Sequence, residues 1–185
     1  FRTLVRSGEE LIDWAEPVRN FKHRECYQNL HQYVFGPHSD RVFVLYGLRR
    51  TGKTTMIRQI ILDLAPSQRK KTALIQIRST DTLSALNSDL KDLERNGYRY
   101  VFIDEVTLMK DFIEGGALFS DIYASSGIRI ILSGTDSLGF VFTESDQLYD
   151  RCILLHTTFI AYREFEAVLG IKGIDEFLRS GGTMS

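Results

Sequence analysis

The stretch GLRRTGKTT, from Gly47 to Thr55, lies between an apolar run and a helical pattern, and this order limits the possible folds. The preceding run over 41–47, RVFVLYG, does not alternate apolar and polar residues, which predicts a strand buried on both faces. Residues 53–65 follow with apolar side chains at helical spacing. Their shared face holds Met56, Ile57, Ile60, Ile61 and Leu64. A buried strand, a glycine loop and a helix in succession are typical of an α/β fold.

The loop fits the pattern G-x-x-x-x-G-K-[ST], which predicts a phosphate-binding loop. Gly47 and Gly52 permit backbone angles that a side chain would forbid, so main-chain N–H groups can turn inward around an anion. The helix that begins near Lys53 directs its positive end to the same place. We predict that Lys53 contacts the terminal phosphates of a nucleotide and that the Thr54 hydroxyl binds Mg²⁺. The predicted nucleotide-binding residues are Gly47, Leu48, Arg49, Arg50, Thr51, Gly52, Lys53, Thr54 and Thr55.

A pair of acids follows another apolar strand pattern in YVFIDE, which ends with Asp104 and Glu105. An acid that leaves a buried strand emerges at the carboxyl edge of the sheet, where open α/β sheets bind ligands. The pair predicts Asp104 as a Mg²⁺ ligand through water and Glu105 as the residue that activates the water attacking the γ-phosphate. The alternative is that both acids only end a strand, and the preceding glycine loop argues against it.

Three further candidate site residues lie at the ends of the last two predicted strands. Ser133 and Thr135 stand at the end of IRIILSGT, where one hydroxyl would sense the γ-phosphate. An ordinary strand-to-loop turn is an equal alternative, and the sequence does not choose between the two hydroxyls. Arg151 is a candidate for stabilising transition-state charge or for contacting a neighbouring subunit, although a surface arginine is the more common case. The guanine-selecting pattern N-K-x-D is absent, which favours adenine.

Predicted strands and helices alternate along the chain, which predicts a parallel sheet with helices on both faces. The five predicted strands span 41–47, 71–78, 98–106, 128–135 and 151–158. The predicted helices after the first forty residues span 53–65, 81–97, 114–127, 162–170 and 174–182, and 143–150 is a short helix or loop. The first forty residues also have helical patterns, interrupted at Pro17, and Asp81 is the expected N-cap of the helix over 81–97.

Length and composition are those of an ordinary soluble domain. The 185 residues suggest one domain, and a formal net charge of −1 gives no case for nucleic-acid or anionic-membrane binding. Two distant cysteines, Cys26 and Cys152, form no disulfide framework, so we expect reduced thiols and a cytoplasmic protein. No apolar run reaches the roughly 18 residues that a membrane span needs.

Taken together, these motifs resemble those of the prokaryotic AAA+-type ATPases of the P-loop superfamily. Members of that group carry a GxRRxGKTT loop, an hhhhDE strand (h, hydrophobic), a strand ending in TGS and a PLSFREF-like segment. The corresponding segments here are GLRRTGKTT, VFIDE, LSGTD and FIAYREFEAVLG, followed by FLRSGG. Asp150 stands where the group has a glycine before its arginine, and the prolines of the last two segments are absent.

The resemblance implies a three-layer P-loop NTPase fold with five parallel strands in the order 5-1-4-3-2. It implies ATP and Mg²⁺ as cofactors, with Asp104 and Glu105 as the Walker B pair and Ser133 or Thr135 as the first sensor. Arg151 matches the arginine that precedes the fifth strand in the group. Members usually continue into a C-terminal domain, so the resemblance also implies a further domain beyond this chain.

The expected organisation is an N-terminal helical segment (1–40) packed on the core, a P-loop ATPase core (41–160) and the start of a C-terminal helical region (161–185). The first functional hypothesis is a Mg²⁺-dependent ATPase that drives or gates an attached domain or partner, with a homo-oligomer as the candidate assembly. The second is a nucleotide-gated switch with slow hydrolysis. A small-molecule kinase is a third alternative, for which no arginine-rich lid is visible. Nucleic-acid or protein partners stay open.

Overall fold

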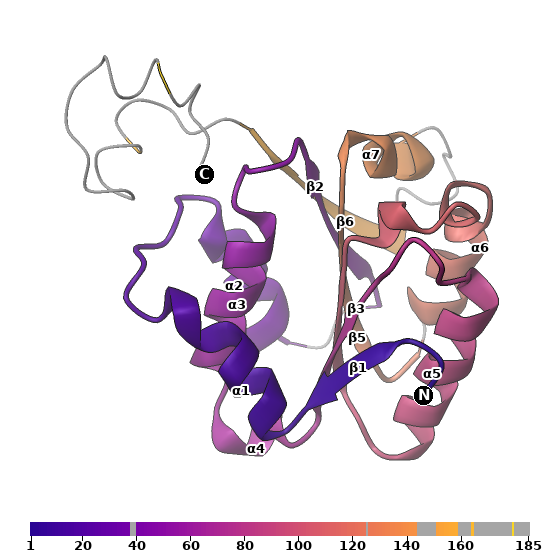
Figure 1. Cartoon of the computed structure of the whole chain (residues 1–185), viewed down its shortest axis with the longest axis horizontal. Helices are drawn as coiled ribbons and strands as arrows, with labels where there is room; N and C mark the ends of the chain where they lie inside the picture. Colours follow the sequence, from indigo (N-terminus) through magenta and orange to yellow (C-terminus); the bar gives the residue numbers. More distant parts are fainter. Residues whose placement is uncertain (38–39, 125, 144–150, 159–163, 165–178, 180–185) are drawn as a thin grey trace.

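The fold is a six-stranded sheet between two layers of helices (Figure 1). The structure, a computed structural model, describes residues 1–37, 40–124, 126–143 and 151–158, together with Glu164 and Arg179. The strands are β1 (Leu4–Ser7), β2 (Val42–Gly47), β3 (Thr72–Gln76), β4 (Tyr100–Asp104), β5 (Arg129–Gly134) and β6 (Cys152–Thr157). The helices are α1 (Glu9–Ala15), η1 (Glu16–Val18), α2 (Tyr27–Phe35), α3 (Lys53–Asp63), α4 (Pro66–Arg69), α5 (Leu83–Arg95), η2 (Val106–Leu108), α6 (Phe112–Ala124) and α7 (Asp136–Thr143).

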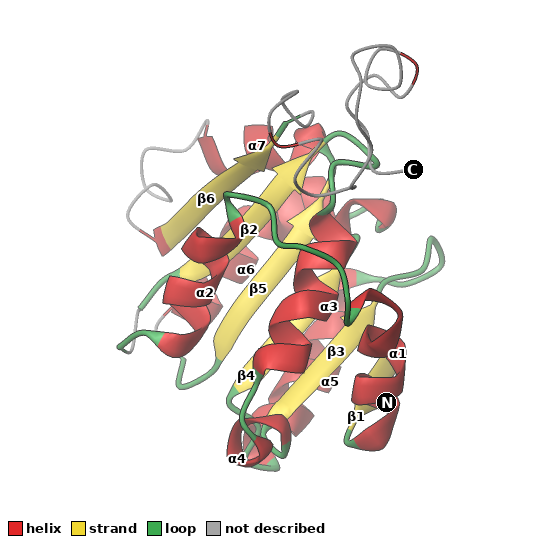
Figure 2. Ribbon diagram, turned by 90° about the vertical axis from the view of Figure 1, so that its left-hand side faces the viewer, coloured by secondary structure: helices red, strands yellow, loops and turns green. Residues whose placement is uncertain are grey.

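The strand order is β1-β3-β4-β5-β2-β6, which corrects the predicted five-stranded order (Figure 2). The five strands β3, β4, β5, β2 and β6 pair in parallel and keep the succession that the resemblance implied. The added strand β1 pairs antiparallel with β3, and Leu4 lies opposite Gln76. We predicted only helices in this region, because a four-residue edge strand carries too little periodicity to be recognised.

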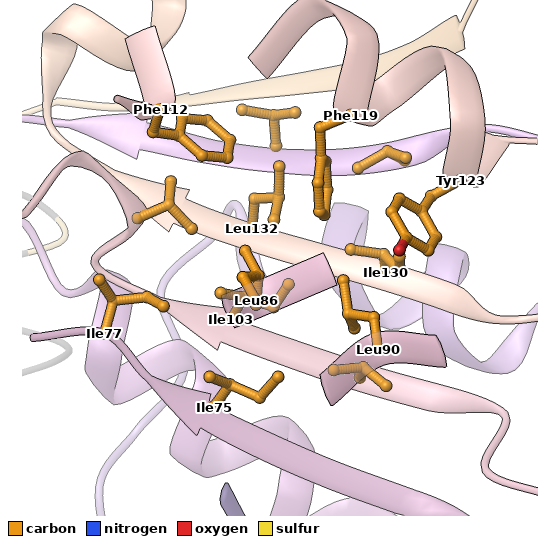
Figure 3. Close-up of a cluster of buried hydrophobic side chains, with 14 of the residues drawn as sticks. Ile75, Ile77, Leu86, Leu90, Ile103, Phe112, Phe119, Tyr123, Ile130 and Leu132 are labelled. Atoms are coloured by element: carbon orange, nitrogen blue, oxygen red, sulfur yellow. The ribbon is translucent and has the colours of Figure 1, made fainter. Parts of the chain in front are cut away.

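Each face of the sheet carries its own hydrophobic core, because successive side chains of a strand point to opposite faces. Phe43 and Leu45 of β2 pack with α1, α2 and α3, and Val42 and Val44 belong to the cluster under α5, α6 and α7. Figure 3 shows this second cluster, where strand isoleucines and leucines meet Leu86 and Leu90 of α5 and the aromatic rings of α6. Those rings belong to Phe112, Phe119 and Tyr123. The apolar face predicted for 53–65 is confirmed, since all five side chains are buried.

Local signals at helix ends were predicted less well than the helices themselves. Thr82, and not Asp81, is the N-cap of α5, and its hydroxyl accepts a hydrogen bond from the Ala85 N–H (3.2 Å). The Asp81 carboxylate instead accepts from the Arg78 N–H (2.7 Å). Helices α4 and α7 were not predicted. The patterns over 144–150, 162–163, 165–170, 174–178 and 180–182 lie outside the described residues.

A buried aspartate of α5 holds the N-terminal residues on the sheet. The Asp89 side chain accepts hydrogen bonds from the Arg2 N–H (2.9 Å) and the Thr3 N–H (2.7 Å), and also from the Thr3 hydroxyl. Asp89 is 1% exposed, so these donors satisfy a carboxylate that water does not reach. The contact fixes the start of β1 beside β3 although 86 residues separate Thr3 from Asp89.

We expect Asp89→Asn to lower the free energy of unfolding by about 1–3 kcal/mol, because an amide cannot accept all three hydrogen bonds and leaves buried donors unpaired. Urea unfolding measures this change, and hydrogen exchange at residues 4–7 shows whether β1 loosens. Asp92→Asn on the exposed side of the same helix is the control and should stay within about 0.5 kcal/mol of wild type. Equal effects of the two substitutions would contradict the anchoring role.

Candidate functional site

The glycine loop, residues 47–55, connects β2 to α3 at the carboxyl edge of the parallel strands (Figure 1). Gly52 has φ 90° and Arg50 has φ 63°, so two residues of the loop adopt left-handed conformations. Gly47 has φ 156°, and a Cβ atom there would lie 2.3 Å from the Thr157 carbonyl oxygen at the end of β6. Glycine is therefore required at Gly47 by space and favoured at Gly52 by backbone conformation.

A pocket of about 380 Å³ opens in front of this loop. Its lining combines the loop with the ends of β4 and β5 and comprises Arg49, Arg50, Gly52, Lys53, Thr54, Thr55, Asp104, Glu105, Thr107, Leu108, Gly134 and Thr135. Three predicted nucleotide-binding residues, Gly47, Leu48 and Thr51, are not part of the lining. Thr51 is fully buried, and its hydroxyl bonds to the Leu48 carbonyl (2.8 Å) and the Thr157 hydroxyl (2.7 Å). Its side chain therefore supports the loop from behind.

The ammonium group of Lys53 lies at the inner side of the loop. It donates hydrogen bonds to the carbonyl oxygens of Gly47 (2.8 Å) and Leu48. Burial lowers the pKa of Lys53, and the nearby carboxylates of Asp104, Asp136 and Glu105 oppose that shift. A cation held beside a helix N-terminus and a glycine loop suits a polyphosphate.

Asp104 is the most enclosed acid of the site. Its side chain is 5% exposed and accepts hydrogen bonds from the hydroxyls of Ser133 (2.5 Å) and Thr54 (3.2 Å). Burial raises the pKa of Asp104, and the hydrogen bonds from Ser133 and Thr54 counter the rise. A carboxylate and a hydroxyl are hard oxygen ligands, so Asp104 and Thr54 fit a Mg²⁺ ion that takes its other ligands from phosphate and water. Within the described residues, no cluster of three or more His, Cys, Asp or Glu offers an all-protein metal site.

Glu105 differs from its neighbour in exposure and conformation. It is exposed at the pocket, with φ 60° and ψ 45°, and its N–H donates to the Ser133 hydroxyl (3.0 Å). A non-glycine residue in this region costs on the order of 1–3 kcal/mol, and such residues cluster at functional sites. The turn directs Glu105 out of the line of β4, whereas Asp104 stays within it.

The two candidate hydroxyls of β5 occupy different surroundings. Ser133 is buried and bridges Asp104 and the Glu105 N–H. Thr135 lines the pocket, and its N–H and hydroxyl both contact the hydroxyl of Thr107 (3.1 and 3.3 Å). Thr107 was not predicted, although it stands only two residues after Glu105. The Thr135 hydroxyl also hydrogen-bonds with the Ser137 hydroxyl (2.9 Å). Ser133 thus contacts both acids, whereas Thr135 is the one of the two that lines the pocket.

Arg151 is not brought to the pocket. It is exposed and directly precedes β6, whose first residue, Cys152, lies opposite Val42 at the start of β2. The glycine loop starts at the other end of these strands, where Gly47 lies opposite Thr157. Six residues at about 3.3 Å each put roughly 20 Å between the two edges. Arg151 therefore cannot contact a ligand held by the loop of its own chain.

The fold and the glycine loop define a P-loop NTPase of the AAA+ type. The chain belongs to the AAA domain family, because the family model matches residues 39–166. None of the curated proteins compared with this sequence gives a significant match. No helix within the described part of the chain combines the length and apolar character needed to span a bilayer.

Solved structures of Hsp104 share this fold. The extended casein complex of S. cerevisiae Hsp104 has a TM-score of 0.60 and 14% identity, covering 92% of this chain and 33% of that chain. The S. cerevisiae Hsp104–ADP complex has a TM-score of 0.60 and 15% identity, over 90% and 26% of the two chains. Closed-state Hsp104 with ATPγS and FITC-casein has a TM-score of 0.57 and 16% identity, over 96% and 34%. The chain therefore spans about a third or less of these proteins, and identities this low show the fold alone.

We expect Asp104→Asn to raise the stability of the nucleotide-free protein at pH 7. Because burial raises the pKa of Asp104, the folded protein holds the proton more tightly than the unfolded chain does. Stability from this group is present at low pH and is lost as the pH rises through the folded pKa. Urea unfolding should therefore show an advantage of Asp104→Asn that grows as the pH rises above about 4, the pKa of an unfolded aspartate. An Asp104→Asn protein less stable than wild type at pH 7 would contradict this account.

Proposed function

We propose that the chain binds ATP with Mg²⁺ in this pocket and hydrolyses the bond to the γ-phosphate. The observation that carries the proposal is the hydrogen bonding of Asp104 to Thr54 and Ser133, with Asp104 and Thr54 lining the same pocket as Lys53. Hsp104 structures contain ADP and ATPγS, which supports a nucleotide for this fold without assigning one to this chain. The absence of N-K-x-D from the sequence favours adenine.

Different residues of the pocket would bind the phosphates, hold the metal ion and activate the water. The loop N–H groups and Lys53 would hold the β- and γ-phosphates, and Thr54 and Asp104 would hold Mg²⁺. Mg²⁺, when bound, neutralises charge on the phosphate oxygens. Glu105 would orient a water molecule and take its proton as the water oxygen attacks the γ-phosphorus. The bond from the γ-phosphorus to the bridging oxygen breaks, and ADP and inorganic phosphate leave.

The position of Arg151 supports a role between subunits. An arginine that stabilises transition-state charge has to approach the γ-phosphate, and Arg151 lies at the far edge of its own sheet. We propose that it completes the pocket of a neighbouring copy in a homo-oligomer. An isolated chain would then bind nucleotide and hydrolyse it slowly, as a nucleotide-gated switch does. Assembly would supply the faster turnover that drives an attached domain or partner.

Glu105→Gln should bind Mg²⁺–ATP within a few-fold of wild type and lose phosphate release by about 10²–10⁴-fold, because an amide cannot accept the proton of water. Calorimetric titration measures binding, and a phosphate-release assay measures turnover. Glu114→Gln changes an exposed acid outside the pocket and should keep full activity. Normal hydrolysis by Glu105→Gln would show that another group activates the water.

Lys53→Ala provides the test of the proposal as a whole. Wild type at a nucleotide concentration of 100 times Kd gains about 2.7 kcal/mol of stability, which is roughly 5–10 °C in Tm for a protein of this size. Lys53→Ala should lose this shift, and removal of Mg²⁺ with EDTA should reduce it in wild type. If wild type shows no shift and no heat of binding with ATP or ADP, the proposed function is wrong.

If Arg151 acts between subunits, turnover per chain should rise with protein concentration. Arg151→Ala should then lower turnover of the assembled protein by about 10³–10⁵-fold and leave nucleotide affinity unchanged. Arg95→Ala removes another exposed arginine and serves as the control. Constant turnover at all concentrations, with full activity in Arg151→Ala, would exclude the role of Arg151.

A further inference from the structure

Arg24 is a buried arginine that joins three distant parts of the chain. It lies between η1 and α2 and is 6% exposed. Its Nε and Nη2 atoms donate to the two carboxylate oxygens of Glu164 (3.1 and 3.3 Å), a residue 140 positions away in the sequence. Its Nη1 atom donates to the carbonyl oxygens of Thr51 (2.7 Å) and Thr158 (3.0 Å). One guanidinium group therefore contacts the glycine loop, the end of β6 and Glu164.

Glu164 fixes the orientation of this guanidinium. The paired contacts between two nitrogens and two oxygens hold the planar group in one direction. Glu164 is 8% exposed and also accepts a hydrogen bond from the Glu25 N–H (3.0 Å). Glu164 belongs to the segment YREF, for which the sequence suggested a family resemblance but no function.

The contact with the Thr51 carbonyl bears directly on the pocket. The carbonyl of Thr51 and the N–H of Gly52 belong to one peptide group, which is planar and trans. A carbonyl oxygen held at Arg24 therefore directs the Gly52 N–H to the opposite side. Gly52 lines the pocket. A hydrogen bond from a charged donor also polarises the peptide group, which strengthens its N–H as a donor.

We propose that Arg24 is a positioning residue for the nucleotide, which fixes the Thr51–Gly52 peptide so that the Gly52 N–H faces the phosphates. Glu164 holds Arg24 in that role and thereby links the segment after β6 to the glycine loop. This inference rests on the proposed function, because it assigns the phosphates as the ligand of the Gly52 N–H. By reciprocity, a bound nucleotide strengthens the contact between Arg24 and Thr51.

The test uses a double variant, Arg24→Met with Glu164→Gln, because removing one partner alone leaves an uncompensated buried charge and endangers folding. The glutamine keeps an acceptor for the Glu25 N–H. We expect the folded double variant to bind Mg²⁺–ADP about 10- to 100-fold more weakly in calorimetric titration. Losses of this size are typical when a residue that orients a binding group, without touching the ligand, is removed. Arg24→Lys retains the charge but not the two-pronged geometry, and should lose affinity in the same direction.

A matched control separates positioning from general stability. Asp89→Asn removes buried hydrogen bonds far from the loop and should lower Tm while leaving Mg²⁺–ADP affinity unchanged. A double variant that binds as tightly as wild type, or a control that loses as much affinity, overturns the proposal.

A second measurement needs no nucleotide, so it separates this inference from the proposed function. Hydrogen exchange in the nucleotide-free double variant should be at least about tenfold faster at Met56, whose N–H donates to the Gly52 carbonyl (2.9 Å) at the start of α3, and unchanged at the core strand β4. If wild type binds no nucleotide, the proposed function and the phosphate role of Gly52 both fail. Faster exchange in the double variant then supports only the contact of Arg24 with the Thr51 carbonyl. Unchanged exchange at Met56 overturns the positioning role of Arg24 in either case.

Discussion

The parallel pairing of β4, β5 and β2 is the constraint on which the pocket depends. Leu45 lies opposite Ser133, and Ile103 lies opposite Leu132, so the polar residues that follow these strands emerge together at one edge. Hydrogen bonds along the sheet thus bring the Ser133 hydroxyl within 2.5 Å of the Asp104 carboxylate, although the two residues are 29 positions apart in the sequence. A shift of one residue in this register would exchange the faces of every side chain on the strand and separate the acid from its hydroxyl.

The residues of the pocket are held at a cost to the fold. Asp104 is a carboxylate whose burial raises its pKa, while Arg50 and Glu105 adopt left-handed conformations that favour glycine. Asp89 is also a buried acid, but main-chain N–H groups surround its carboxylate and it ties β1 to α5. The contrast separates a buried acid that holds two elements together from one for which we propose a bound metal ion as a further partner. Such unfavourable local features persist where the surrounding structure fixes them and are expected at functional sites.

The sequence predicted what is encoded locally. The glycine loop, the strand before it and the acids Asp104 and Glu105 each occupy a few consecutive residues, so their pattern was readable without knowledge of the fold. Features set by distant contacts were missed or assigned wrongly. β1 becomes a strand because β3 lies beside it, and Arg24 is buried because Glu164 accepts its hydrogen bonds. Thr82 is the N-cap in place of the predicted Asp81, because the Asp81 carboxylate pairs with Arg78.

The glycine loop is supported at the carboxyl edge of the sheet, and Arg151 lies at the opposite edge. At the carboxyl edge, Arg24 and Thr157 support the loop from behind through the Thr51 carbonyl and hydroxyl. At the opposite edge, Arg151 is exposed and about 20 Å away, so within one chain it lies beyond reach of the pocket. The shape of the loop is therefore set inside the chain, by segments on both sides of it in the sequence. The proposed action of Arg151 on a γ-phosphate therefore requires a neighbouring copy of the chain, and the proposed hydrolysis would depend on assembly.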